Sequence, residues 1–239
     1  MFSESTDLYD KIYTKLKDYA KEAGEVGAWI KRLRPNAKSV LDVACGTGEH
    51  DRFLSNEYQV DGIDLNPEFI QIARSKNPRG RYHVGDMIDF KLGKRYDVLI
   101  CLFSSIGYVQ TIGNLQNTIA TFDRHLNDDG IMLVEPWFTP DAWNPGVLHM
   151  TRVDEDHFKV CRMNISEAKS ERLSFFKFHY LIGTPQGVRH FTEDHILGLF
   201  TVTEMKAAFA ANGLGVDYEN HGISGRGLYI AARAHRAIS

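Results

Sequence analysis

The sequence predicts an α/β protein with a mostly parallel sheet and an antiparallel insertion. Between residues 39 and 136, short runs of buried-type residues alternate with amphipathic segments, which is typical of strands joined by covering helices. After Trp137 the pattern changes to longer runs rich in β-branched and aromatic residues. With 239 residues and 43% hydrophobic composition, we expect one domain over residues 1–239.

The predicted parallel strands are apolar runs that end in polar residues or glycine turns. A helix is expected from about Glu49, and another after Asn66, where asparagine as cap and Pro67 at the first helical position form a good start. Residues 127–130 are expected to form a turn before the fifth strand. The five strands are SVLDVA, YQVDGID, RYHV, YDVLICLF and GIMLVEP, and a further helix runs through LQNTIATFDRHL.

Residues 1–34 are predicted to be helical. Leu8, Ile12 and Leu16 recur every four residues, and Pro35 closes the segment. Because this segment precedes the first strand, we expect it to form a lid or flank over the sheet.

Residues 140–195 are expected to form an antiparallel β insertion that roofs a site at the edge of the parallel sheet. The runs FKVCRMNI, ERLSFFKFHYLI and GVRHFTEDHILGLFTV are separated by the turn-forming stretches SEAKS and GTPQG. A helix through TVTEMKAAFAANG, stopped by Gly213, and a final hairpin through SGRGLYIAAR should follow.

Composition excludes several classes of protein. A net charge of −3 makes nucleic acid a poor partner, and the N-terminal MFSESTDLYDKIYTKLKDY reads as neither a signal peptide nor a membrane span. Cys45, Cys101 and Cys161 are odd in number and widely spaced, which argues against disulfides and a zinc site. We therefore expect a cytoplasmic protein without metal, nucleic acid or membrane partners.

The stretch VLDVACGTGEH is a strand, a glycine turn and a helix start, the usual context of a nucleotide site. A dinucleotide fingerprint would need a third glycine where Asp51 stands, so that pattern is incomplete. Asp42 and Glu49 flank the turn, and carboxylates there oppose a pyrophosphate and favour a cation. S-adenosylmethionine, a cationic nucleoside without phosphate, suits the turn better than NAD does.

The predicted strand ends supply the rest of a nucleoside site, because ligands of open α/β sheets bind beyond the carboxyl edges of the strands. Asp64 ends the second strand, where a carboxylate would bind the two ribose hydroxyls. Asp86 follows the third strand and would accept from the adenine amino group, with Met87 against the ring. Each of these aspartates also fits a helix cap or a turn.

These motifs, LDVACGTG, GIDLNPEF, VGDMIDF and YDVLICLFSSIGY, resemble those of class I S-adenosylmethionine-dependent methyltransferases. FSSIGY, VEPWF, GVRHF, LFT and SGRGL are similar to the nucleotide (TDP)-linked 3-amino-sugar N,N-dimethyltransferases of macrolide sugar biosynthesis. The resemblance implies a Rossmann-like seven-stranded sheet with helices on both faces and S-adenosyl-L-methionine as cofactor. The implied cofactor-binding residues are Tyr19, Asp42, Ala44, Gly46, Thr47, Gly48, Asp64, Leu65, Asp86, Met87 and Phe103.

Three residues are candidates for hydrogen bonds to the reacting amine: Tyr108, His190 and Tyr13. Each also has a structural alternative. Tyr108 fits a tyrosine packed under the insertion, His190 fits an ordinary polar histidine, and Tyr13 fits a core tyrosine on a helix face.

A nucleotide sugar also brings a diphosphate. Arg226 between two glycines has the chemistry to bind it, as an alternative to a solvated turn, and Arg189 is a second candidate. Trp137 and Phe138 are expected to stack on a base or sugar face.

The predicted reaction is N-methylation, performed twice, on the amine of a TDP-linked 3-amino-deoxysugar. There are three alternatives: a methyltransferase for another small acceptor, a non-catalytic S-adenosylmethionine-binding protein, and a nicotinamide oxidoreductase. Methylation of nucleic-acid bases is disfavoured, because FSSIGY lacks the Asn/Asp-Pro-Pro-aromatic stretch that amino-directed base methyltransferases carry there. The insertion also makes a homodimer possible.

Overall fold

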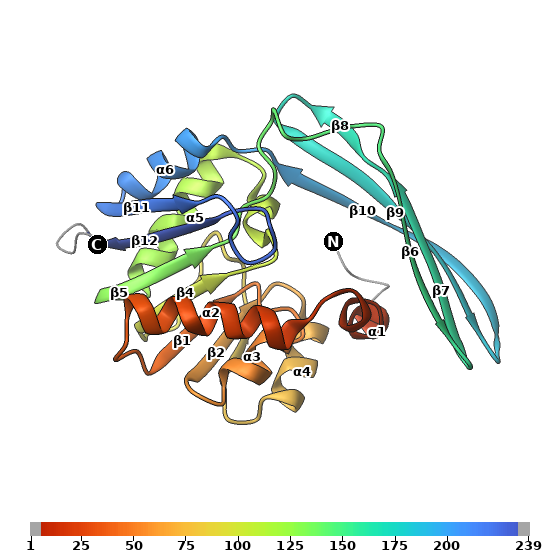
Figure 1. The fold of residues 1–239 in the computed structure, drawn as a ribbon, viewed down its shortest axis with the longest axis horizontal. Helices are drawn as coiled ribbons and strands as arrows, with labels where there is room; N and C mark the ends of the chain where they lie inside the picture. The colour runs from red at the N-terminus through yellow and green to blue at the C-terminus, as the bar shows by residue number, and fades with distance from the viewer. Residues whose placement is uncertain (1–5, 234–239) are drawn as a thin grey trace.

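The computed structural model describes residues 6–233, which form two sheets (Figure 1). The first has seven strands in the order β11-β12-β5-β4-β1-β2-β3, and all its neighbours pair in parallel except β12, which is antiparallel to β5 and β11. The predicted mostly parallel seven-stranded sheet is therefore confirmed. Its strands are β1 (Ser39–Val43), β2 (Gln59–Asp64), β3 (Tyr82–Val84), β4 (Tyr96–Cys101), β5 (Leu126–Val134), β11 (Leu214–Glu219) and β12 (Leu228–Arg233).

Helices cover both faces of this sheet (Figure 1). One face packs against apolar residues of α2, such as Val26 and Ile30, and the other against α5 and α6, through residues such as Phe122 and Phe209. The helices that flank the sheet are α2 (Tyr19–Leu33), α3 (Glu49–Leu54), α4 (Pro67–Lys76), α5 (Ile112–Arg124) and α6 (Val202–Ala210).

Local signals explain where these helices begin. The Asn66 side chain accepts hydrogen bonds from the backbone N–H groups of Glu68 and Phe69, as expected for the cap of α4. Thr201 and Glu204 form a reciprocal capping box at the start of α6.

The second sheet is wholly antiparallel and follows β5 in the chain, which confirms the predicted insertion. Its main path is β10-β9-β7-β6, and β8 pairs with β9. The SEAKS stretch, expected to be a turn, contains β8, and β6 lies in a stretch that the sequence did not mark as a strand. Its strands are β6 (Leu148–Glu155), β7 (Phe158–Ile165), β8 (Glu167–Ser170), β9 (Leu173–Thr184) and β10 (Gly187–Gly198).

Helix α1 (Thr6–Leu16) lies between the two sheets (Figure 1). Leu8 and Ile12 are buried in one core with Val153 and Phe158 of the second sheet. Leu16, the third apolar position of the predicted face, is 49% exposed. Residues 1–5 of the predicted N-terminal segment lie outside the described residues.

The turn expected at residues 127–130 is instead part of β5. The register of β4 and β5 shifts there, because Tyr96 pairs with Leu126 whereas Val98 pairs with Ile131. Three extra residues on β5 are thus accommodated as a bulge inside the strand, which is why turn-forming residues occur there without ending it. Over residues 6–233, no helix is both long and apolar enough to cross a membrane.

Candidate functional site

A cavity of about 330 Å³ opens where the carboxyl ends of the parallel strands meet α1 and the second sheet. Two groups of residues face each other across it. The parallel sheet and its loops contribute Ala44, Gly46, Asp64, Leu65, Asp86, Met87, Phe103, Tyr108, Trp137 and Arg226, whereas α1 and the antiparallel sheet contribute Tyr9, Tyr13, Arg162, Phe176, Phe178 and Leu197.

The two glycines of the turn after β1 have different tasks. Both have positive φ, +56° at Gly46 and +71° at Gly48. A Cβ on Gly46, which lines the cavity, would meet no atom within 4 Å, so the cavity itself occupies that space. A Cβ on Gly48 would lie 2.6 Å from Nδ2 of Asn77. Gly46 therefore opens the backbone to a ligand, whereas Gly48 lets the turn pack on α4.

Asp64 at the end of β2 fixes the shape of this turn. Its Oδ2 accepts from the Gly46 backbone N–H at 2.9 Å, and its Oδ1 accepts from the Asn66 N–H at 2.8 Å. Burial raises the pKa of the Asp64 carboxyl above its usual value. Asp86 similarly accepts from the Ile88 N–H at 2.9 Å. Both aspartates thus have the structural role considered from the sequence, and both also line the cavity.

A smaller hollow beside the turn is lined by Tyr19, Asp42 and Thr47, together with Ala44 and Gly46. Asp42 is buried and contacts the buried Asp51; burial and this second carboxyl raise the Asp42 pKa. Burial likewise raises the pKa of Asp51 to about 6. Gly48 lines neither this hollow nor the main cavity.

The acidic flank inferred from the sequence is therefore largely neutralised in the structure. Glu49 is paired with Lys76, its Oε1 lying 2.5 Å from Nζ, and the raised pKa values of Asp42 and Asp51 disfavour two charges there. The sequence predicts ionised, unpaired carboxylates beside the turn, whereas the fold supplies a partner to each.

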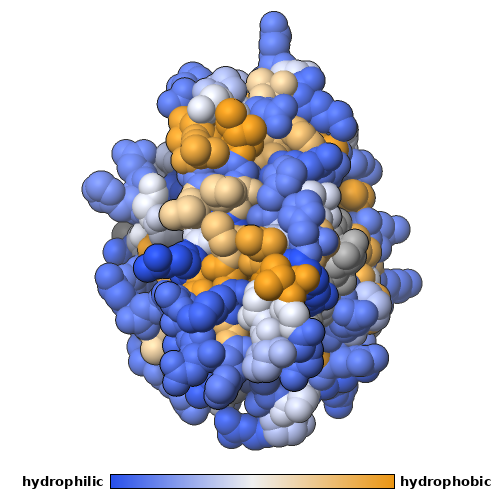
Figure 2. Space-filling model, turned by 90° about the vertical axis from the view of Figure 1, so that its right-hand side faces the viewer, coloured by the Kyte–Doolittle hydropathy of each residue, from blue (hydrophilic) through white to orange (hydrophobic). Residues whose placement is uncertain are grey.

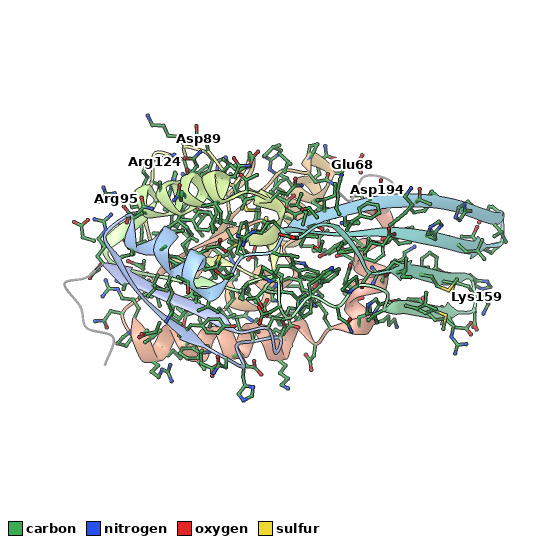
Figure 3. All side chains as sticks on the ribbon, turned by 90° about the horizontal axis from the view of Figure 1, so that it is seen from above. Glu68, Asp89, Arg95, Arg124, Lys159 and Asp194 are labelled. Atoms are coloured by element: carbon green, nitrogen blue, oxygen red, sulfur yellow. The ribbon has the colours of Figure 1, made fainter. Side chains whose placement is uncertain are left out.

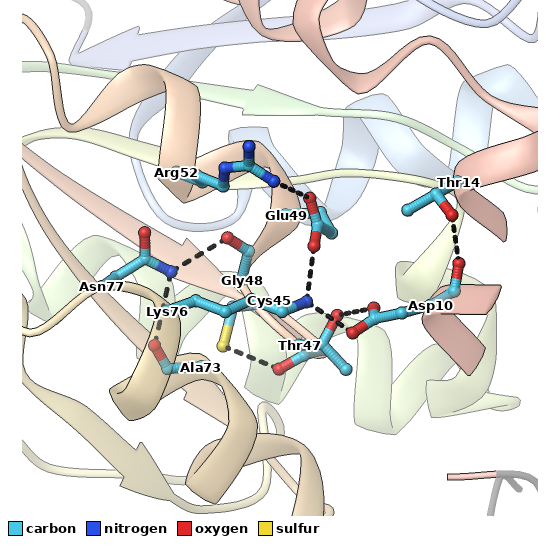
Figure 4. Close-up of polar contacts among 11 residues, drawn as sticks. Asp10, Thr14, Cys45, Thr47, Gly48, Glu49, Arg52, Ala73, Lys76 and Asn77 are labelled. Atoms are coloured by element: carbon cyan, nitrogen blue, oxygen red, sulfur yellow. Dashed lines mark hydrogen bonds and ion pairs between the residues drawn. The ribbon is translucent and has the colours of Figure 1, made fainter. Parts of the chain in front are cut away.

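Helix α1 is tied to the glycine turn by polar contacts (Figure 4). Asp10 accepts from the Thr47 hydroxyl at 2.6 Å and from Lys76 Nζ at 2.5 Å, so it joins α1 to both the turn and α4. Because Tyr9 and Tyr13 of the same helix line the cavity, these contacts hold one wall of the site in place.

Arg226 lies in the loop between β11 and β12, and its side chain turns inward. Its Nη1 donates to the Ser104 hydroxyl at 3.0 Å, and its guanidinium lies 5.2 Å from the Trp137 ring centroid. Burial lowers the pKa of Arg226, although the carboxylate of Glu135 acts in the opposite direction. Glu135 in turn accepts from the backbone N–H groups of Phe103 at 2.6 Å and Ser224 at 3.0 Å, which fixes the loops around the arginine.

Tyr108 is hydrogen-bonded to His195, with 2.7 Å between its hydroxyl oxygen and Nδ1. His195 is 1% exposed and its ring stacks on Phe176, with 5.3 Å between centroids and 8° between planes. Burial lowers the pKa of His195 to about 3. The imidazole is therefore neutral throughout the physiological range.

The structure does not bring His190 and Arg189 to the cavity. Both are exposed on β10 near its hairpin end. His190 stacks on His179, with 5.8 Å between centroids, and the Arg189 guanidinium lies 5.3 Å from the centroid of Phe191. Side chains alternate along a strand and only the far end of β10 reaches the site, so the GVRHF motif alone could not locate them.

Two polar residues of the second sheet, His195 and Arg162, contact cavity-lining tyrosines and were not predicted from the sequence. His195 lies on β10 five residues after His190, and Arg162 on β7 donates to the Tyr13 hydroxyl at 2.9 Å. The Arg162 guanidinium lies 4.3 Å from the Phe178 ring centroid. A buried strand position next to aromatic residues was the available signal, but only the pairing of β7, β9 and β10 shows which face of each strand meets the cavity.

These features fit a nucleoside cofactor. Open space stands where a Gly46 side chain would be, and carboxylates end β2 and follow β3 at the same edge of the sheet. The parts of the chain that the structure describes hold no group of three metal-ligating side chains.

Comparison with known proteins agrees with a site for a nucleoside cofactor. A methyltransferase-domain family model matches residues 40–130. The chain is 39% identical to the dTDP-3-amino-3,6-dideoxy-alpha-D-glucopyranose N,N-dimethyltransferase of Streptomyces fradiae, over 95% of this chain and 89% of that protein. It is 36% identical to the corresponding 3,4,6-trideoxy enzyme of Streptomyces venezuelae, over 97% and 98% of the two chains. The chain belongs to the amino-sugar N,N-dimethyltransferase family.

Solved structures of similar proteins show the same architecture. DesVI of Streptomyces venezuelae matches with a TM-score of 0.92 and 36% identity, over 98% of this chain and 100% of that one. CalS10 of Micromonospora echinaspora, an amino pentose methyltransferase solved with S-adenosylmethionine bound, matches with a TM-score of 0.87 and 32% identity, over 98% of each chain. The protein is thus an S-adenosylmethionine-dependent methyltransferase with the class I fold, as the sequence predicted.

Proposed function

We propose that this methyltransferase adds two methyl groups to the amine of a TDP-linked 3-amino-deoxysugar, in deoxysugar biosynthesis for an antibiotic. The names of two similar enzymes support this acceptor class. The structural observation that carries the proposal is a single cavity lined by a nucleoside-type strand edge, by two arginines, one from each sheet, and by several aromatic rings.

On the donor side, the proposed cofactor residues form two groups. Ala44, Gly46, Asp64, Leu65, Asp86, Met87 and Phe103 line the main cavity, and Tyr19, Asp42 and Thr47 line the adjoining hollow. In this proposal Asp64 accepts from the ribose hydroxyls and Asp86 from the adenine amino group. Bound S-adenosylmethionine supplies a methyl group activated by a positively charged sulfur, so the protein needs no metal for this step.

On the acceptor side, Arg226 and Arg162 are the proposed diphosphate ligands. Both guanidinium groups line the cavity and are held by hydrogen bonds, from Arg226 to Ser104 and from Arg162 to Tyr13. Partly buried, orientated guanidinium groups bind phosphates through paired N–H donors. Trp137 is the proposed stacking surface, and its indole N–H is fixed by a 2.9 Å hydrogen bond to the Ser174 hydroxyl.

Tyr108 is the proposed group that orientates the amine. With its proton directed to His195 Nδ1, the tyrosine oxygen presents lone pairs to the cavity and accepts an N–H from the substrate. The amine lone pair is then free to face the methyl donor, and holding it so supplies much of the rate acceleration. Tyr13 is a second proposed hydrogen-bonding group, because its ring lines the same cavity.

The Tyr108–His195 pair is a poor general base. Burial lowers the pKa of His195 to about 3 and raises that of Tyr108 well above its usual value. The substrate amine must therefore lose its proton before it binds, and we expect the rate to rise with pH according to the pKa of the amine. Helix α1, as a lid, and the antiparallel sheet, as a roof, are proposed to exclude water from the reacting centre.

The direct test incubates the purified protein with S-adenosylmethionine and a TDP-linked 3-amino-3,6-dideoxyhexose, and follows acceptor mass together with S-adenosylhomocysteine release. Sequential gains of one and then two methyl groups support the proposal. A 4-amino sugar should be included, because another relative, 35% identical, is named as a dTDP-4-amino-2,3,4,6-tetradeoxy-D-glucose N,N-dimethyltransferase.

Other outcomes decide between the remaining functions. Cofactor binding without a mass change in any amino sugar would favour another small acceptor or a non-catalytic binding protein. We also propose a cytoplasmic location, which is consistent with three free cysteine thiols, Cys45, Cys101 and Cys161.

A further inference from the structure

Helix α1 contacts both halves of the cavity through neighbouring side chains. Asp10 accepts from the Thr47 hydroxyl of the glycine turn at 2.6 Å, and Tyr13 accepts from Arg162 Nη1 of the antiparallel sheet at 2.9 Å. Residues three apart on a helix lie next to each other on its surface, so both contacts depend on the same turn of α1. A displacement of that turn therefore changes the glycine-turn side and the Arg162 side of the cavity together.

Apolar contacts hold α1 against the antiparallel sheet. Leu8 and Ile12 share one core with the inner side of that sheet. Its outer side is not covered in the same way, since Met163 and Leu181 are 43% and 50% exposed, and Figure 2 shows apolar side chains on this side of the molecule. Within residues 6–233, α1 and the antiparallel sheet thus pack on each other along the inner side, which also lines the cavity.

Polar contacts hold α1 against the glycine turn and α4. Lys76 Nζ of α4 donates both to Asp10 Oδ2 and to Glu49 Oε1, at 2.5 Å each (Figure 4). Thr47 is 2% exposed, and the side chains of Lys76 and Asp10 are 21% and 30% exposed, so water screens these bonds only in part. Asp10 therefore forms two charge-assisted hydrogen bonds that are stronger than those of a fully exposed carboxylate.

The other contacts of α1 with this half of the molecule are weaker ties. The rings of Tyr9 and Phe69 lie 4.8 Å apart, centroid to centroid, but both line the cavity, so their packing depends on what fills it. Asn66 Nδ2 donates to the Thr6 hydroxyl at 3.4 Å, which is long for a hydrogen bond. Asp10 thus supplies the short polar bonds of this attachment.

The partners of Asp10 face the hollow beside the glycine turn. Thr47 and Glu49 line that hollow, whereas Lys76 lines neither the hollow nor the main cavity. A cofactor in the hollow therefore meets residues that Asp10 holds directly, at Thr47, or through Lys76, at Glu49.

We propose that Asp10 is a positioning residue that couples binding of the cofactor to binding of the acceptor. Cofactor in the hollow fixes the glycine turn, Asp10 then fixes α1, and α1 places Tyr13 against Arg162. The acceptor half of this inference rests on the proposed function, in which Arg162 binds a diphosphate. Coupling between two sites is reciprocal, so a bound acceptor must strengthen cofactor binding by the same factor.

The first test measures how fast the cofactor product leaves the full chain. Protein loaded with radiolabelled S-adenosylhomocysteine is mixed with excess unlabelled compound, and the retained label is followed in time. We expect Asp10→Ala to release it about 10-fold faster, and Asp10→Asn, which keeps the shape but loses the charge, about 3-fold faster. Lys15→Ala is the control on the same helix. It removes an ion pair of 3.1 Å with Glu155 of the antiparallel sheet and should leave the release rate unchanged.

The second test measures the coupling itself. Isothermal titration calorimetry gives the affinity for TDP, the probe for the acceptor, with and without saturating S-adenosylhomocysteine. The natural protein should bind TDP at least roughly 5-fold more tightly with S-adenosylhomocysteine present, and Asp10→Ala should bring this ratio to about 1. A purely structural role for Asp10 would weaken TDP binding equally in both conditions and keep the ratio. Lys159→Ala, at a residue towards the far end of the long strands (Figure 3), should keep the natural ratio.

Each variant must keep the natural unfolding temperature to within a few degrees, which shows that it is folded. A natural protein whose TDP affinity ignores the cofactor overturns the inference, as does a folded Asp10→Ala protein that keeps the natural ratio. Failure of the natural protein to bind TDP in either condition would contradict the proposed acceptor and the coupling with it. The release rate still tests the contact of Asp10 with the cofactor side in that case, and an unchanged rate in Asp10→Ala overturns that part as well.

Discussion

The two sides of the cavity are built in different ways. On the parallel-sheet side, Gly46, Asp64 and Asp86 follow successive strands, and each reaches the site because its strand ends there. On the antiparallel side, Arg162, Phe176 and Leu197 lie within strands, and each reaches the site because its side chain points inward. Position along the chain therefore identifies the residues at the strand ends of the parallel sheet, whereas the register and face of a strand decide which residues of the antiparallel sheet reach the site.

The largest effect is expected on the parallel-sheet side of the cavity. There the substitution Gly46→Val should weaken S-adenosylmethionine binding by at least roughly 100-fold. The new side chain would enter the cavity and would also be strained at a φ of +56°. Isothermal titration calorimetry measures the affinity. Gly93→Val is the matched control, because Gly93 has a φ of +65° and open space but lies away from the cavity. If Gly93→Val lowered the affinity equally, backbone strain alone would explain the loss.

On the acceptor side, Arg226→Gln should raise the KM for a TDP-amino sugar roughly 30-fold, because charge-assisted hydrogen bonds contribute about 1.5–3 kcal/mol. Arg189→Gln should leave KM unchanged, since Arg189 is exposed and outside the cavity. Steady-state kinetics of both variants at saturating cofactor makes the measurement. An equal effect of the two substitutions would show that β10 moves towards the site during the reaction.

Tyr108→Phe should lower kcat roughly 10-fold with a smaller change in KM, because the amine loses its orientating acceptor. The rise of kcat/KM with pH should keep its midpoint, since neither Tyr108 nor His195 titrates in the neutral range. His190→Phe is the control and should have natural kinetics. A shifted midpoint in Tyr108→Phe would instead make the tyrosine part of the proton path.

The two smallest predicted effects concern stability, and the larger of them involves Asp51. Its pKa is about 6 in the folded protein and about 3.9 in an unfolded chain, so the folded state binds the proton more tightly. This contribution to stability is complete below about pH 4 and is lost as pH rises to about 6. The unfolding temperature of Asp51→Asn relative to the natural protein should therefore be higher at pH 8 than at pH 4, by about 4 °C. Differential scanning calorimetry at both pH values checks this sign.

The contribution of His195, in the second sheet, to the stability of the protein should depend on pH in the opposite direction. Burial lowers the pKa of His195 to about 3, so its stabilising contribution is present above about pH 6.5 and is lost as pH falls towards 3. His195→Phe should thus reduce the loss of unfolding temperature between pH 7 and pH 5 by about 3–4 °C, because roughly 2 kcal/mol of the contribution is lost over that range. An unchanged difference would mean that His195 is solvated in solution.

Most of the fold was predictable from the sequence because its signals are local. The alternation of apolar runs with capped helices predicted β1 to β5, and Asn66 and Thr201 start helices as expected. The exceptions have physical reasons. Residues 127–130 favour a turn locally, yet pairing with β4 keeps them in a bulged strand, and β8 exists only because β9 offers a partner.

The donor side of the site was predictable for the same reason. Its residues occur in order along the chain, next to the glycine turn and the strand ends, where few arrangements are possible. Even there, the electrostatics were not predictable. Glu49 gained Lys76 as its partner only when α4 packed beside the turn, and Asp42 meets Asp51 because α3 packs against β1.

The sequence by itself determined the class of enzyme, the cofactor and the parallel sheet, since short-range patterns and a glycine turn specify them. Tertiary structure decided that His195, and not His190, contacts Tyr108, that Arg226 lines the cavity whereas Arg189 does not, and that Arg162 joins them. Side chains of a strand alternate between two faces, and which face meets a site depends on pairing with strands far away in the chain.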